Sequence, residues 1–265
     1  MRESRVSRSV WGRIKGALTR GRFSALFWLL VVTIALPVAV PGPMIQRGMA
    51  IILFIVMLSG LRAISNHRRE VVIGVCLAVP AVILNATAAI LGIKAAYLSS
   101  LVLYGLFFGY LAVLILLDTL RRTEIEAETI YAAVDVYLLL ALFWTMGYYL
   151  LAVADPGSFH FPETDAIGQI QAERVAVRQE PGLATAEDVD WREAHQEAQG
   201  TLMYYSFVTL TTLGYGDIYP TGDAARILAM LEATLGQLYL VILVARLVGL
   251  YTAQESERRK QTPPT

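Results

Sequence analysis

Six long apolar segments, separated by polar stretches, dominate the pattern of the chain. They cover about residues 23–40, 47–64, 71–93, 96–117, 129–154 and 224–252. Each is close to the roughly 20 apolar residues that a helix needs to cross a bilayer. The pattern therefore predicts an all-α integral membrane protein with six transmembrane helices.

Composition and charge agree with this prediction. The 265 residues are 56% hydrophobic and only 17% charged, and a soluble protein of this length carries more charge. With six spans, the basic stretches all fall on one side of the membrane: residues 1–22, 65–70, 118–128 and 253–265. The positive-inside rule makes that side the cytoplasm. We expect a cell membrane, such as a bacterial inner membrane, with lipids around the helices and both termini in the cytoplasm.

A distinct motif lies between the last two apolar segments. Residues 209–217 read TLTTLGYGD. A pore for dehydrated K+ must replace the ion's water with oxygen ligands, and a row of backbone carbonyls on one side of an extended segment can do so. Such a backbone needs unusual dihedral angles, which Gly214 and Gly216 tolerate. Thr212 would add a hydroxyl group at the inner end. We therefore predict that this stretch enters the membrane as a re-entrant loop and lines a pore.

The surrounding sequence strengthens this interpretation. The run from Tyr204 to Pro220, YYSFVTLTTLGYGDIYP, resembles the pore helix, selectivity filter and exit turn of six-transmembrane, one-pore-loop potassium channels. Leu213 stands where valine or isoleucine is commoner, a mild change because the carbonyl group faces the ions. The resemblance implies a pore helix at 200–211 and a filter formed by Thr212, Leu213, Gly214, Tyr215 and Gly216. It also implies K+ sites at Thr212, Leu213, Gly214 and Tyr215.

The resemblance also points to residues that support the filter. Tyr204 and Tyr205 occupy positions where the family often has aromatic residues around the filter. Some members have a carboxylate at the position of Val208, hydrogen-bonded to the aspartate after the filter. Val208 cannot make that bond, so we expect Asp217 to bind another group, such as the hydroxyl of Tyr205.

By this resemblance the chain divides into five parts. These are a basic cytoplasmic segment (1–22), a four-helix membrane domain (23–117), a linker (118–128), a pore domain (129–252) and a short cytoplasmic tail (253–265). The pore domain comprises an outer helix (129–154), an acidic extracellular turret (155–199), the pore helix, the filter (212–217) and an inner helix (224–252). Segment 96–117 has no charged residue, whereas a voltage sensor carries repeated arginines. We therefore expect no steep voltage gating.

Two of these parts allow more than one interpretation. The basic segment 1–22 fits either an amphipathic helix on the membrane surface or a disordered leader. The acidic turret either concentrates cations at the outer mouth or simply keeps a long loop solvated. Within it, His160 and His195 lie near carboxylates, although their spacing matches no known metal site.

Three residues are candidates for gating. Gly236 lies in the middle of the inner helix, either as a hinge or as a close-packing site against the pore helix. Asp135 lies about two turns into the outer helix, where an unpaired carboxylate is costly. Arg246 lies near the same membrane face, where its long side chain can either extend to the membrane surface or pair with Asp135. We expect the two to form an ion pair near an inner gate.

Together these observations predict a channel that conducts K+ passively. One filter per chain cannot surround an ion, so the resemblance implies a homotetramer. The sequence shows no nucleophile–base pair and no phosphate-binding motif, and we expect no enzymatic activity, no cofactor beyond the permeant K+ and no nucleic-acid partner. The alternatives are a closed-pore membrane sensor or scaffold, and a weakly selective cation channel.

Overall fold

The computed structural model describes residues 21–39, 43–64, 68–155, 157–162 and 191–261. The described chain is almost entirely helical: α2 (Arg22–Ala39), α3 (Pro43–Ala63), α4 (Arg68–Leu91), α5 (Lys94–Arg121), α6 (Ala127–Ala154), α8 (Trp191–Leu210) and α9 (Asp223–Gln261). Two short strands, β1 (Phe159–His160) and β2 (Tyr219–Pro220), pair antiparallel. Most of the basic segment, residues 1–20, and turret residues 163–190 lie outside the described residues, as does the side chain of His195.

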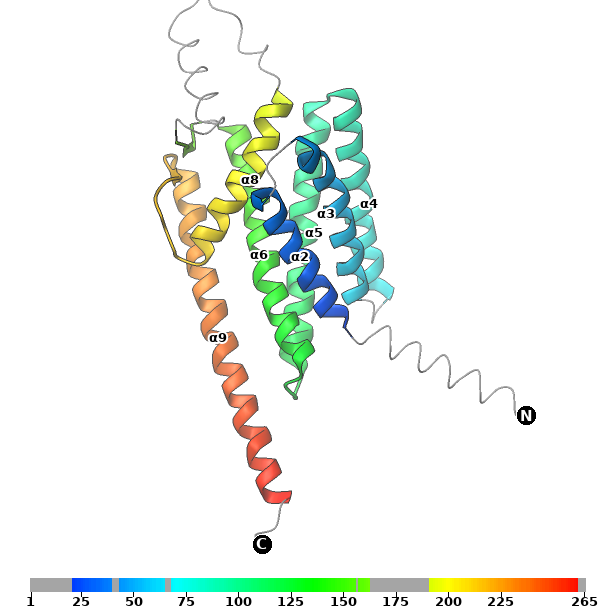
Figure 1. Ribbon diagram of the computed structural model, residues 1–265, viewed down its shortest axis with the longest axis vertical. Helices are drawn as coiled ribbons and strands as arrows, with labels where there is room; N and C mark the ends of the chain where they lie inside the picture. The colour runs from blue at the N-terminus through cyan, green and yellow to red at the C-terminus, as the bar shows by residue number, and fades with distance from the viewer. Residues whose placement is uncertain (1–20, 40–42, 65–67, 156, 163–190, 262–265) are drawn as a thin grey trace, which may run out of the picture.

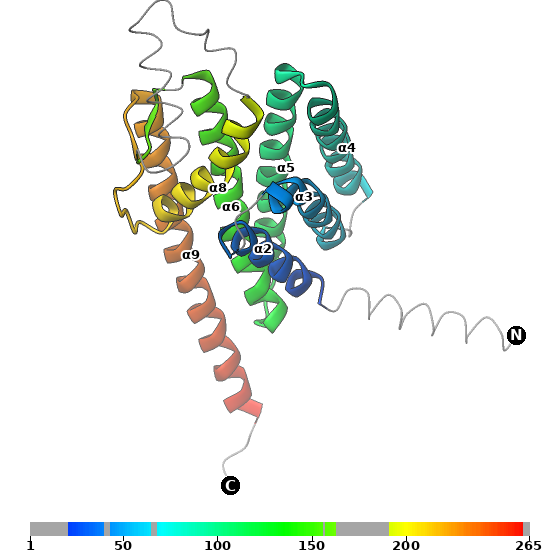
Figure 2. The ribbon, with the colours of Figure 1, turned by 45° about the horizontal axis from the view of Figure 1, so that its top comes forward.

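Helices α2 to α6 are packed side by side and run in alternating directions (Figure 1). In Figure 1, α2 to α6 pass up and down through the molecule, and α5 lies between α4 and α6. Helix α2 packs against both α3 and α6. Figure 2 shows α8 between α6 and α9, with α2 nearby. Helix α8 descends only partway, residues 211–222 return to the upper end, and α9 then descends through the whole length.

All six predicted apolar segments form helices, and four of these are long and apolar enough to cross a membrane. Among the described residues, these four candidates cover 68–88, 95–121, 127–154 and 223–256. The apolar parts of α2 and α3 are shorter within the described chain, at 22–36 and 51–63. The structure therefore supports an all-helical membrane protein with four candidate membrane-spanning helices.

Close packing between α5 and α6 joins the first helices to the last ones. Gly109 lies against the ring of Phe143, which a Cβ atom at this position would approach to 3.1 Å. Phe107 and Phe108 on α5 and Leu139 on α6 are fully buried. Only residues 122–126 separate the two helices, which makes them antiparallel neighbours. Helices α2 and α5 are thus packed directly onto α6 of their own chain, and α3 and α4 pack in turn against α2 and α5.

Several helix boundaries differ from the sequence prediction. The predicted pore helix at 200–211 is the second half of the longer helix α8, which begins at Trp191. The predicted linker 118–128 shortens to 122–126, and α9 continues beyond 252 to Gln261, through most of the predicted tail. Hydropathy marks where a helix leaves the bilayer, whereas the helix itself continues through good helix formers such as Glu, Gln, Lys and Arg.

Candidate functional site

The segment that follows α8 has an unusual, alternating backbone. Thr212, Gly214 and Gly216 have φ angles of +58°, +58° and +79°, whereas the residues between them do not have positive φ. Alternation of left- and right-handed residues turns successive peptide groups toward the same side. Thr212 is β-branched, so its positive φ is a strained conformation of about 1–3 kcal/mol that its surroundings must maintain.

Hydrogen bonds from α8 and α9 hold the inner end of this segment. The amides of Leu213 and Gly214 both donate to the carbonyl oxygen of Val208, at 2.9 and 3.4 Å. Gln237 of α9 donates from its Nε2 to the Oγ1 of Thr212 at 3.1 Å. The last carbonyls of a helix lack intrahelical partners. The carbonyl of Val208, in the last turn of α8, therefore accepts these two amides and holds the start of the segment in place.

Tyr204 and Asp217 connect the outer end of the segment to α8. The hydroxyl of Tyr204 donates to Oδ2 of Asp217 at 2.7 Å, and the amide of Ile218 donates to Oδ1 at 3.0 Å. Within the chain, Asp217 therefore binds Tyr204 and not the predicted partner, Tyr205. Neighbouring residues point about 100° apart on a helix, and Tyr205 faces inward, with its ring packed edge-on against Tyr148 at 5.0 Å.

The two strands join the residues that follow the segment to the residues that follow α6. β1 pairs with β2, and the ring of His160 stacks on Tyr219 with centroids 4.6 Å apart. The amides of Thr221 and Gly222 both donate to the carbonyl of Ser158, at 2.9 and 3.2 Å. The segment is thus attached at both ends, although its residues 211–217 are exposed in the single chain.

Gly236 is the point where α9 approaches the end of α8. A Cβ atom at this position would lie 2.5 Å from the carbonyl oxygen of Leu210 and 2.8 Å from its Cδ1. The same carbonyl accepts a hydrogen bond from the hydroxyl of Tyr137 at 3.2 Å. Of the two interpretations of Gly236, this close approach supports packing against α8.

The expected ion pair between Asp135 and Arg246 is not formed. Asp135 is fully buried, and within the described chain neither of its carboxylate oxygens has a hydrogen-bond partner. Arg246 instead donates from its Nη2 to the carbonyls of Thr119 and Arg122, at 3.3 and 2.8 Å, and to that of Leu120. The end of α5 offers several carbonyls without intrahelical partners, and these bind the guanidinium group.

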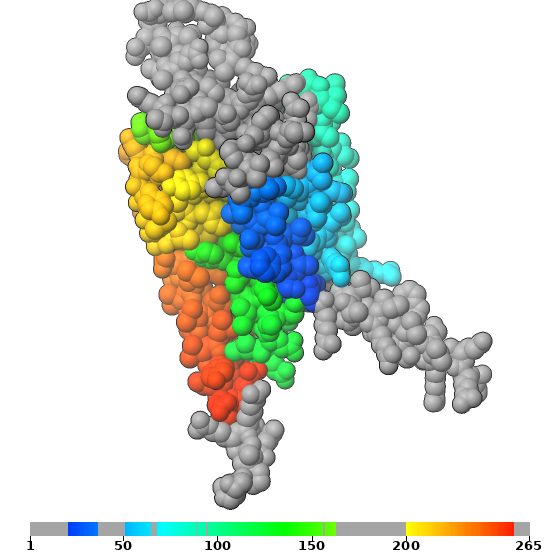
Figure 3. All heavy atoms as spheres, viewed as in Figure 1, coloured from blue at the N-terminus to red at the C-terminus, as the bar shows by residue number. Residues whose placement is uncertain are grey.

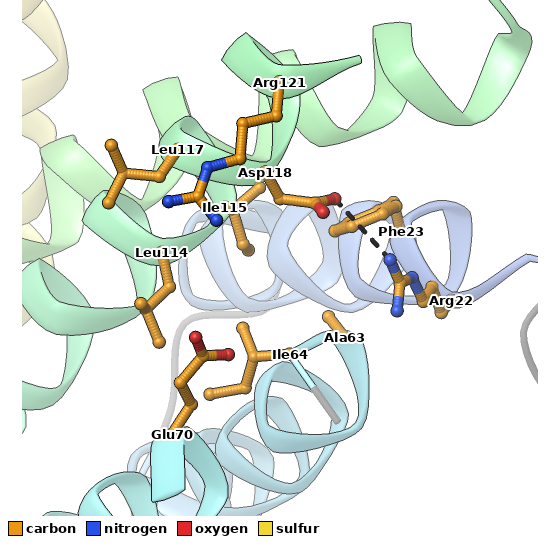
Figure 4. A pocket seen from close by; sticks show the side chains of 10 residues that line it. All are labelled: Arg22, Phe23, Ala63, Ile64, Glu70, Leu114, Ile115, Leu117, Asp118 and Arg121. Carbon is orange, nitrogen blue, oxygen red and sulfur yellow. Dashed lines mark ion pairs between the residues drawn. The ribbon is translucent and has the colours of Figure 1, made fainter. Parts of the chain in front are cut away.

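The same end of α5 also binds α2. Asp118 forms ion pairs with Arg22 at 3.5 Å and with Arg122 at 2.8 Å. Figure 4 shows the ion pair between Arg22 and Asp118 at a cavity of about 80 Å³, whose lining also includes Phe23, Glu70 and Arg121. The end of α5 is therefore a junction where α2, α6 and α9 meet.

Sequence reasoning missed Glu232. This residue of α9 is fully buried, and its carboxylate accepts hydrogen bonds from Tyr148 of α6 and Ser206 of α8, both at 2.5 Å. The available signal was the position of a carboxylate within the apolar segment 224–252, since intramembrane carboxylates are costly and require partners.

Comparison with known proteins assigns α8, the alternating segment and most of α9 to a known protein domain. Residues 192–253 match the model of a protein family described as Ion channel. The searches with this chain matched no curated protein and no solved structure. The matched range begins in α8, includes the alternating segment and ends within α9. The chain therefore contains an ion channel domain, and this domain, together with the apolar helices, supports a membrane protein that conducts ions passively.

Proposed function

We propose that this protein is a potassium-selective channel and that residues 212–216 form its filter. The observation that carries the proposal is the alternating left-handed backbone of Thr212, Gly214 and Gly216 at the C-terminal end of α8. In this conformation, successive carbonyl oxygens can replace the water around K+. The negative end of the α8 dipole lies at the inner end of the segment and favours a cation there.

A single chain leaves this filter open, which supports assembly around a shared axis. The side chains of Leu213 and Tyr215 are 54% and 68% exposed. Figure 3 shows α8, the filter segment and the start of α9 together on one flank of the molecule, in yellow and orange. Four copies arranged with this flank toward a common axis would surround the ion with carbonyls and cover the exposed Tyr215. We therefore propose a homotetramer.

Conduction is proposed to depend little on voltage. Helix α5 carries charges only near its two ends, at Lys94, Asp118 and Arg121. A charge must move through the membrane field to make opening steeply voltage-dependent, and the apolar centre of α5 offers none. The proposed channel therefore opens in response to another signal.

Ion flux into liposomes tests the selectivity. We expect reconstituted protein to pass K+ and Rb+ far faster than Na+, and the variant Gly214→Asp to pass neither, with an unchanged oligomeric mass. Equal flux of K+ and Na+ in the wild-type protein would falsify the selectivity and indicate a weakly selective cation channel. If no ion passes, the protein is a closed-pore sensor or scaffold.

A further inference from the structure

A buried carboxyl group joins three helices behind the filter. Glu232 of α9 has no exposed surface, and neither do Tyr148 of α6 and Ser206 of α8. The hydroxyl of Tyr148 donates to Oε2 of Glu232, and the hydroxyl of Ser206 lies 2.5 Å from Oε1. A carboxyl group is costly to bury without partners, and here both of its oxygens have one.

Further contacts close this network. The Oγ of Ser206 also lies 2.8 Å from the carbonyl oxygen of Ala141 on α6. The ring of Tyr148 packs edge-on against Tyr205 and Phe159, with centroids at 5.0 and 5.6 Å. Side chains from α6, from α8 and from β1 therefore hold the two hydroxyl groups in place around Glu232.

The network lies one helical turn from the contacts that hold the filter. Glu232 precedes Gly236 by four residues on α9, and Gly236 packs against the carbonyl of Leu210. Ser206 precedes Leu210 by four residues on α8. Because four residues make about one turn, the Glu232–Ser206 contact sets the register in which α8 meets α9, one turn before the filter begins.

We propose that Glu232 is a positioning residue for the filter. Its two oxygens fix α8 against α6 and α9, so that Val208 and Gln237 can hold the alternating backbone of 212–216. This inference rests on the proposed function, because it assigns a residue that maintains the conducting form of that filter.

The chemistry of the network distinguishes two substitutions. Methionine would leave the hydroxyl of Tyr148 buried without its partner and would break the contact of Ser206 with α9, although Ser206 could still donate to the carbonyl of Ala141. Glutamine keeps both contacts, because its Oε1 can accept from Tyr148 and its Nε2 can donate to Ser206. A serine hydroxyl can accept one bond while donating another, so Ser206 would then donate to Ala141.

Hydrogen exchange of the full-length protein, followed by mass spectrometry, measures the positioning without any ion flow. We expect Glu232→Met to speed exchange in peptides that contain the amides of Leu213 and Gly214 by about tenfold, which corresponds to about 1.4 kcal/mol. Glu232→Gln should stay within about threefold of the wild-type rate. The matched control is Thr234→Val, which should leave the rate unchanged because it removes an exposed hydroxyl that, within the described chain, binds only Met230 of its own helix.

K+ flux in the same variants supplies the second readout. We expect Glu232→Met to lower K+ flux by about tenfold and Glu232→Gln to restore it. Unchanged exchange in Glu232→Met, or a Glu232→Gln variant as defective as Glu232→Met, overturns the inference. If wild-type protein passes no K+ while the exchange pattern is as expected, the proposed function fails and the positioning role stands.

A second pair of variants covers the case in which Glu232→Met does not fold. Tyr148→Phe and Ser206→Ala each remove one hydroxyl partner of the carboxyl group. Because both act through Glu232, we expect their effects on exchange to be non-additive when combined. Simple addition of the two effects would show that the hydroxyls act independently, and would overturn the inference.

Discussion

The outer and inner halves of α9 are held in different ways. In the outer half, Glu232, Gly236 and Gln237 contact α6, α8 and the filter segment within two helical turns. In the inner half, Arg246 reaches the end of α5, while Val241, Ile242 and Val248 are each more than half exposed. One helix therefore carries two separate connections: its outer half contacts the proposed filter, and its inner half is joined to the end of α5.

The largest expected effect comes from disturbing the outer connection at Gly236. In Gly236→Ala the new Cβ would lie 2.5 Å from the Leu210 carbonyl, so we expect destabilisation of about 3 kcal/mol, the upper end of the range for overpacking. K+ flux should fall by about tenfold or more. Thermal unfolding in detergent and liposome flux measure the two effects. The matched control is Gly249→Ala on the same helix, where a Cβ meets nothing within 4 Å.

Removing the inner connection should affect opening and not selectivity. Arg246→Met removes the guanidinium donor from the carbonyls of Thr119, Leu120 and Arg122, at a cost of about 2 kcal/mol for hydrogen bonds to a charged group. We expect a changed open probability in single-channel recordings and an unchanged ratio of K+ to Na+ permeability. Arg246→Lys should recover part of the effect, because an ammonium group cannot match the planar fork of arginine. A loss of selectivity would contradict the division between the two halves.

A smaller effect is expected at the outer end of the filter. Tyr204→Phe removes the hydrogen bond to Asp217, which contributes about 1 kcal/mol. We expect faster decay of the K+ current during sustained opening. Tyr205→Phe is the comparison, because the ring of Tyr205 packs inward against Tyr148 and Phe159 and keeps this packing without its hydroxyl. Equal decay in the two variants would show that Tyr204 has no special role.

The smallest expected effect is the coupling energy between Asp135 and Arg246, which should be near zero. Asp135 and Arg246 do not pair, so the changes in stability caused by Asp135→Asn and Arg246→Met should add to within about 0.5 kcal/mol in the double variant. Thermal unfolding of the four proteins measures the coupling. A larger coupling energy would contradict the separation of the two residues and support the ion pair that the sequence predicts.

Much of the architecture could be predicted from hydropathy alone. The six apolar segments mark six helices because burial and membrane contact both select apolar residues along the whole helix. The TLGYG motif also located the positive φ angles at Gly214 and Gly216, since glycine tolerates them. The same angle at Thr212 could not be foreseen, because a β-branched residue disfavours it and only the contacts from α8 and α9 hold it there.

Partners of charged and polar side chains were harder to predict. Depth in the membrane pairs Asp135 with Arg246, but depth does not say in which direction a side chain points around its helix. The resemblance points to both Tyr204 and Tyr205, yet the 100° between them decides which one reaches Asp217. Glu232 is difficult to recognise because its two partners are hydroxyl groups from other helices, and such groups carry no charge pattern in the sequence.

The short connection between α5 and α6 has a consequence for assembly. Residues 122–126 can reach no more than about 18 Å even when fully extended. In the proposed homotetramer, each copy would therefore keep α2 to α5 beside its own α6 and would not exchange them with a neighbouring copy. In an assembly that mixes wild-type and altered copies, a change in the front helices would act through the subunit that bears it, so the response should be graded by the number of altered copies.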